Sequence, residues 1–158
     1  MKKRILVTML LVLVLVLMTI GIAQAKDPLR CTIDYTFLGQ EVDGRFVSWV
    51  ATISGDINGT VYYFASGPPM RFTGQASHYA DSWEIVDGDG NVIMAGTDQT
   101  GSSTIRHGKN SNWRTNGVVT EAYGDYADWV GRQVHQSGHF TWAAPGLPKD
   151  GTGIFRVN

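Results

Sequence analysis

Two carboxylates lie inside segments that otherwise have the composition of β-strands. Glu84 belongs to Ser82-Trp-Glu-Ile-Val86, and Glu121 belongs to Val118-Val-Thr-Glu-Ala122. A carboxylate in a strand either faces water, which is the commoner case, or points into the interior. An interior position would raise its pKa and make it a candidate general acid or base. We therefore take Glu121 as the candidate polar group of an interior ligand site.

Aromatic side chains provide the candidate walls of that site. Four of them lie in segments of alternating polarity and are predicted to line a core or cavity together with Glu121: Tyr35, Trp49, Trp83 and Phe155. Trp113 has two interpretations, because it follows the polar run that begins at Lys109. It is either a core residue or an exposed platform on which a sugar ring stacks.

The remaining chemical patterns predict no metal or cofactor site. His135 and His139 could share a metal only across a tight turn at Ser137-Gly138, and two ligands are too few for structural zinc. The segment Asp87-Gly-Asp-Gly-Asn91 begins like a calcium loop, but Val92 stands where an EF-hand needs glycine, so a hairpin turn is favoured. The chain has no nucleophile elbow and no phosphate-binding loop, and its catalytic residues, if any, are unknown.

Short strands must position these residues. Strict alternation runs from Cys31 to Phe37, and extended patterns recur further along the chain at 47–53, 61–64, 82–86, 92–97, 113–122, 133–135, 139–142 and 151–157. Connections are predicted at 39–45, 101–112 and 145–150, a hairpin turn at Ser137-Gly138, and a helical turn or loop at 123–131. About eight strands with frequent turn signals predict an all-β fold, a single small antiparallel β-barrel of the calycin-like kind.

The amino-terminal segment predicts export. Three basic residues precede an apolar run, and Ala23-Gln24-Ala25 follows it as a small-x-small cleavage site. We expect residues 1–25 to be a signal peptide, residues 26–158 to be one barrel domain, and the protein to be secreted or periplasmic. The alternative is an uncleaved anchor, since 19 residues from Ile5 to Ala23 approach the span of a bilayer core.

Charge and cysteine content restrict the partners. The chain has 13 Lys and Arg and 14 Asp and Glu, and three of the basic residues precede the apolar run, so the mature domain would keep ten basic and fourteen acidic residues. That acidic balance argues against nucleic acid and, after cleavage, against a membrane surface. Cys31 is the only cysteine, so the domain has no internal disulfide, and we expect Cys31 in the core.

The carboxy-terminal half resembles a known family of barrels. The segments 117–139, EIVDGDGNVI and GTGIFRVN are similar to elements of the allene oxide cyclase and dirigent group of eight-stranded barrels. The resemblance implies an apolar interior that holds a small molecule or steers its reaction, with no catalytic residue carried over. The expected function is interior binding of a small, mainly apolar ligand, with enzyme activity undecided and a homo-oligomer left open. The alternative is a surface module that recognises glycan or protein around Trp113 and 135–139.

Overall fold

The computed structural model describes residues 26–65, 71–73, 76–106, 110–144 and 147–158. The predicted signal segment lies outside them. Within the described residues the chain forms strands β1 (Leu29–Val42), β2 (Arg45–Gly55), β3 (Gly59–Ala65), β4 (Arg71–Thr73), β5 (Ala76–Val86), β6 (Val92–Arg106), β7 (Asn110–Ala122), β8 (Gln133–Ala144) and β9 (Leu147–Val157), with a 3-10 helix, η1 (Gly124–Trp129), before β8. No described helix is both long and apolar enough to cross a membrane.

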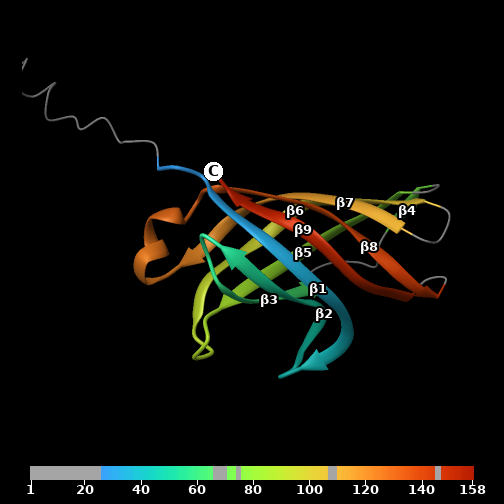
Figure 1. The fold of residues 1–158 in the computed structure, drawn as a ribbon, viewed down its shortest axis with the longest axis horizontal. Helices are drawn as coiled ribbons and strands as arrows, with labels where there is room; N and C mark the ends of the chain where they lie inside the picture. The colour runs from blue at the N-terminus through green and yellow to red at the C-terminus, as the bar shows by residue number, and fades with distance from the viewer. Residues whose placement is uncertain (1–25, 66–70, 74–75, 107–109, 145–146) are drawn as a thin grey trace, which may run out of the picture.

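The strands close into a barrel (Figure 1). Their order is β3-β2-β1-β9-β8-β7-β6-β5, and antiparallel pairing of β3 with β5 joins the two ends of this sheet. The short β4 pairs with the beginning of β5 and stands outside the ring of eight. The fold is therefore a single closed, eight-stranded antiparallel barrel, and the all-β prediction is confirmed.

Alternating polarity places one face of each strand inside the barrel. Cys31, Ile33 and Tyr35 of β1 are buried, whereas their neighbours in sequence are exposed. The turn between β1 and β2 is shorter than predicted, because β1 continues to Val42. Asp43 and Gly44 form this turn with φ of 51° and 77°, the left-handed values that suit a two-residue hairpin loop.

Several predicted connections are strand. The polar stretch 101–112 belongs mostly to β6 and β7, and β9 already begins at Leu147. Ser103 and Ser111 are buried on the inner face, so the inward positions of these strands are small and polar rather than apolar. Hydrophobic alternation is therefore weak there, and the sequence pattern resembles that of a loop. The predicted turn at 87–91 and helical turn within 123–131 are confirmed.

The predicted hairpin at Ser137-Gly138 is wrong, because β8 runs through both residues. Gly138 pairs with Trp113 on one side and Gly153 on the other. A Cβ atom at Gly138 would lie 2.2 Å from the carbonyl oxygen of Thr152, so glycine serves a close backbone approach here rather than a turn.

The barrel interior contains three kinds of side chain. Aliphatic residues and Trp83 fill one part, and Tyr35, Trp49 and Phe140 belong to an aromatic cluster in another. Between hydrophobic side chains lies a buried polar group that includes Asp98 and Gln136. A charged or polar side chain in such a place costs free energy unless it is paired or functional, so this buried polar group is the candidate site.

Candidate functional site

Four of the five predicted ligand-binding residues lie inside the barrel. Tyr35 contacts Trp49 at 5.1 Å between ring centroids, and Trp83 contacts Phe155 at 5.2 Å, both edge to face. Trp83 and Phe155 are fully buried, Tyr35 is 5 % exposed, and Trp49 is half-buried. The structure thus forms two aromatic pairs from these four residues.

The expected inward orientation of Glu121 is wrong. Its side chain is exposed and accepts a hydrogen bond from the Tyr123 hydroxyl at 2.7 Å. The cause is a β-bulge: Ala95 pairs with Glu121 but Gly96 pairs with Val119, which leaves Thr120 as an extra residue. Because Val119 is buried, simple alternation would place Glu121 inside, and the bulge reverses this. The other strand carboxylate, Glu84, also faces outward and forms a 2.6 Å ion pair with Arg45.

The interior carboxylates are Asp81 on β5 and Asp98 on β6. The two residues are direct partners across the two strands, so their side chains share the inner face. Asp98 is 2 % exposed, and Asp81 is partly exposed. Asp81 also pairs with Ala65, the last residue of β3, which places the carboxylate pair beside the end of that strand.

Asp98 is held by a hydrogen-bonded chain that crosses the interior. The Gln136 amide donates to both oxygens of Asp98 at 3.2 Å. The Tyr63 hydroxyl in turn donates to Gln136 Oε1 at 2.7 Å. These residues come from β6, β8 and β3, so the chain links strands on different sides of the barrel. By contrast, the side chain of Asp81 makes no hydrogen bond to any residue that the structure describes.

Two more polar groups face Asp98 without strict hydrogen-bond geometry. The Trp83 indole N–H and the Thr115 hydroxyl are close enough to lower the pKa of Asp98. Both atoms are nevertheless buried without a hydrogen-bond partner among the described residues. Buried donors are rarely left unpaired, so each of these needs an acceptor, either Asp98 in better geometry or an oxygen of a bound molecule.

Both carboxyls have raised pKa values. Loss of hydration is the main cause for Asp81, whose pKa rises to about 7, and the negative charge of Asp98 adds to it. Burial raises the pKa of Asp98 to about 6, against the opposing effect of its hydrogen-bond donors. Two neighbouring carboxyls of this kind titrate as a pair and share a proton around neutral pH. Such a pair can donate or accept a hydrogen bond, and it can transfer a proton.

The sequence signal for this pair was present but lay just beyond the predicted strands. Those strands ended at Ser82 and Thr97, one residue short of each aspartate. Asp81 is two residues before the buried Trp83, and Asp98 is two residues after the inward Gly96. Extending each predicted strand by one residue would have placed both aspartates inside.

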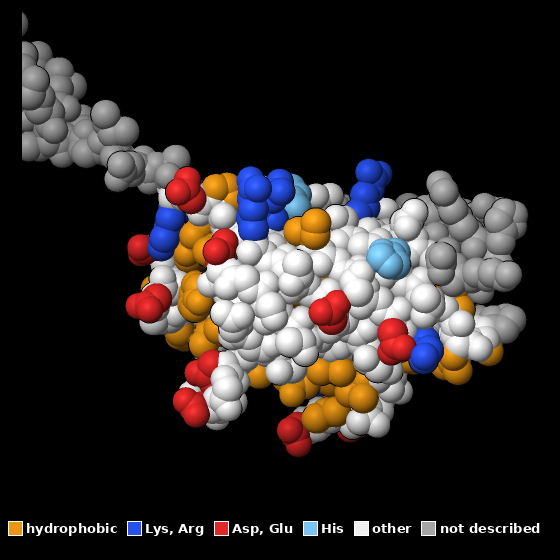
Figure 2. Space-filling model, in the orientation of Figure 1, with side chains coloured by type: hydrophobic (Ala, Val, Ile, Leu, Met, Phe, Trp, Pro, Cys, Tyr) orange, Lys and Arg blue, Asp and Glu red, His pale blue; other side chains and the backbone are white. Residues whose placement is uncertain are grey.

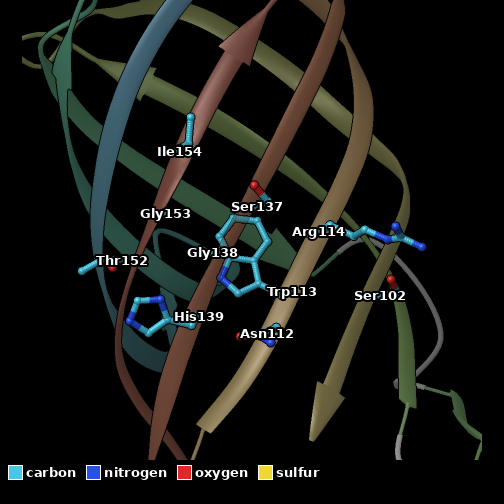
Figure 3. Close-up of a pocket in the computed structure, with 10 residues that line it drawn as sticks. All are labelled: Ser102, Asn112, Trp113, Arg114, Ser137, Gly138, His139, Thr152, Gly153 and Ile154. Atoms are coloured by element: carbon cyan, nitrogen blue, oxygen red, sulfur yellow. The ribbon is translucent and has the colours of Figure 1, made fainter.

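A depression lies on the outer face, over β6 to β9 (Figure 3), away from the carboxyl pair. It has a volume of about 630 Å³, and the backbones of Trp113, Gly138 and Gly153 form one row across it. The side chains beside that row are Ser102, Asn112, Arg114, Ser137, His139, Thr152 and Ile154. The Trp113 ring itself packs against the core and donates from Nε1 to the Tyr35 hydroxyl, so of its two interpretations the core residue is confirmed and the exposed stacking platform is wrong.

His135 and His139 lie on the outer face of one continuous strand and do not face each other. Among the described residues no three His, Cys, Asp or Glu side chains are grouped to hold a metal ion. Comparisons of the chain with known protein families, with curated proteins and with solved structures find no match. The site must therefore be interpreted from its own chemistry.

Proposed function

We propose that this barrel binds a small, mainly apolar molecule that carries a hydroxyl group, with Asp81 and Asp98 as the polar anchor. The observation that carries the proposal is the buried carboxyl pair beside two donors, Trp83 Nε1 and Thr115 Oγ1, that have no partner among the described residues. Hydrophobic and aromatic side chains surround this group. Small-molecule sites commonly combine an apolar wall with a few convergent polar groups.

A hydroxyl group matches the donors and acceptors of the site. It has one donor and two acceptor lone pairs. It can donate to the carboxylate of the pair and accept from Trp83 Nε1 or Thr115 Oγ1, the atoms that lack a partner within the described chain. A pure hydrocarbon would leave those atoms unpaired, and an anion would be repelled by the carboxylates.

Membership of the allene oxide cyclase and dirigent group is part of the proposal, and the closed eight-stranded barrel supports it. If the chain belongs to that group, the carboxyl pair would steer the reaction of the bound molecule in addition to binding it. A proton shared between Asp81 and Asp98 is available to a bound molecule at neutral pH, because both pKa values are raised. Ligand binding alone needs no proton transfer, so binding and steering of a reaction can be measured separately.

The test uses 2-naphthol and 2-methylnaphthalene, which have nearly the same shape but differ in the hydroxyl. Quenching of tryptophan fluorescence should show 2-naphthol binding about ten-fold more tightly, the effect of one satisfied buried hydrogen bond. Asp98→Leu should abolish this preference, and Glu121→Gln, on the outer face, should keep it. Circular dichroism establishes that both variants are folded. Equal binding of the two probes, or binding of neither, would refute the proposal.

Export is also part of the proposal, since the expected ligand site belongs to the domain that begins near Lys26. The observation behind it is the small-x-small triplet that ends at Ala25, after the apolar run. Amino-terminal sequencing of the secreted or periplasmic protein should find the first residue within two positions of Lys26. A membrane-bound product that retains Met1 would contradict it.

A further inference from the structure

Two arginines and a histidine that are far apart in the sequence form one row on the outside of the barrel. Arg30 on β1 pairs with Arg156 on β9, which pairs with His135 on β8. All three alternate with buried neighbours and therefore point outward. Arg114 on β7 belongs to the next row, together with Ser137 and Ile154.

The view of Figure 2 shows the same arrangement in space. Most Lys and Arg side chains of this view lie along its upper edge, whereas Asp and Glu are spread over the left and lower edges and the middle. The acidic neighbours of the basic residues are Asp34, which pairs with Thr152, and Asp56, whose carboxylate accepts from the Arg30 backbone N–H at 2.7 Å. Local charge thus differs from that of the acidic domain as a whole.

The cations of this face have no ion-pair partner among the described residues. The ion pairs there involve Lys26, Arg45 and Lys149, none of them in the row. Arg156 Nε is also buried without a hydrogen-bond partner in the described part of the chain. Like charges directly opposite each other on neighbouring strands destabilise a sheet. A row of unpaired cations therefore costs stability, and a bound anion would remove this cost.

The depression over β6 to β9, called the outer groove below, lies next to this row and is lined mainly by neutral polar groups. Next to Arg114 and His139 it presents the hydroxyls of Ser102, Ser137 and Thr152 and the amide of Asn112. Of the residues that the structure describes, no acidic side chain lines it. Hydroxyl and amide groups match the hydroxyls of a sugar, and arginine forms two parallel hydrogen bonds with a carboxylate or sulfate.

We propose that the outer face of β7, β8, β9 and β1 binds an acidic polysaccharide, with Arg30, Arg156 and Arg114 on its anionic groups. The groove beside Arg114 takes a sugar ring. An anionic membrane fits less well, because Ile154, 51 % exposed, is the only exposed large hydrophobic side chain among the groove's described residues that could enter a bilayer. This surface is distinct from the barrel interior, so the two proposals stand independently.

The experiment measures binding of fluorescein-labelled dextran sulfate by anisotropy at low and moderate salt. Uncharged dextran and vesicles containing an anionic phospholipid are the comparison probes. The double variant Arg30→Gln, Arg156→Gln should bind dextran sulfate about ten-fold or more weakly, since two charge-assisted contacts are lost. The matched control, Arg45→Gln with Lys149→Gln, removes two ion-paired charges that lie neither in the row of Arg30 and Arg156 nor in the lining of the groove, and it should change binding less than about two-fold.

Three results would overturn the inference. One is no binding of dextran sulfate at low salt, and a second is an equal loss in the control variant, which would indicate a net-charge effect. The third is binding to anionic vesicles but not to dextran sulfate, which would assign the surface to a membrane. The Arg30 and Arg156 variant should still bind 2-naphthol as the unmodified protein does, which separates this test from that of the interior site.

Discussion

Stability should fall as the pH rises from about 4 to 7, because of Asp81 and Asp98. In the folded protein the pKa of Asp81 is about 7 and that of Asp98 about 6, whereas the ordinary value for an aspartate side chain is 3.8. At pH values between the ordinary and the raised pKa, the folded chain binds more protons than the unfolded chain. The free energy of unfolding therefore decreases with pH over this window and levels off above it.

The magnitude follows from the shift. For Asp81 a rise from 3.8 to about 7 corresponds to about 4 kcal/mol, at about 1.4 kcal/mol per pH unit. The two aspartates interact, so their costs are not additive and we expect about 4 kcal/mol for the pair rather than the sum. This is large against a total stability of roughly 5–15 kcal/mol.

Urea unfolding at pH 5 and pH 8, followed by fluorescence, measures the effect. The protein should be less stable at pH 8 by several kcal/mol. Asp81→Asn should remove most of the difference, because the amide carries no charge and also relieves the repulsion on Asp98. Asp89→Asn, in the exposed turn after β5, is the matched control and should keep it. A stability that is constant or increases between pH 5 and 8 would refute the burial of the pair.

Three further substitutions test other parts of the structure. Glu121→Gln should change the free energy of unfolding by less than about 0.5 kcal/mol, because the one described hydrogen bond of the Glu121 side chain is with the exposed Tyr123. A large loss of stability would mean that Glu121 faces inward after all. Gly138→Ala should lower the free energy of unfolding in urea by about 2 kcal/mol or more, because its Cβ atom would meet a backbone carbonyl of β9. The control Gly88→Ala, which has open space around it, should leave stability nearly unchanged, and equal losses would contradict the close approach at Gly138. Cys31→Ser should cost about 1–2 kcal/mol, and reductant should leave the melting temperature of the unmodified protein unchanged, which calorimetry can check.

The class of fold was readable from local pattern. Alternation from Cys31 to Phe37 and from Val47 to Ile53 correctly identified the inner faces of β1 and β2, because hydrophobic burial on one side of a strand leaves a period of two in the sequence. The same reasoning placed Trp83 and Phe155 inside. It was less successful for the parts of β6 to β8 where inward positions are polar, as at Ser103, Ser111, Thr115 and Gln136.

Which polar side chains face the interior depends on the pairing between strands, and the local sequence pattern does not reveal this pairing. A bulge at Thr120 turns Glu121 outward, and only the pairing of β6 with β7 shows where that extra residue lies. Extended alternation would place Asp81 and Asp98 on an inner face, but nothing in the local sequence shows that the two are neighbours. Their proximity, and hence their raised pKa values, comes from the register of β5 against β6 and from burial in the closed barrel.

The amino-acid sequence by itself determined the all-β class, the inner faces of the first strands and the absence of an internal disulfide. Composition, short-range alternation and a cysteine count are properties of the chain that need no knowledge of distant contacts. Only the tertiary structure decided which carboxylates face inward and which cations meet on the outside. Arg30 and Arg156 become neighbours through the pairing of β1 with β9, and Arg114 lies in the next row through the pairing of β7 with β8, because strand order and register bring residues that are far apart in the sequence together.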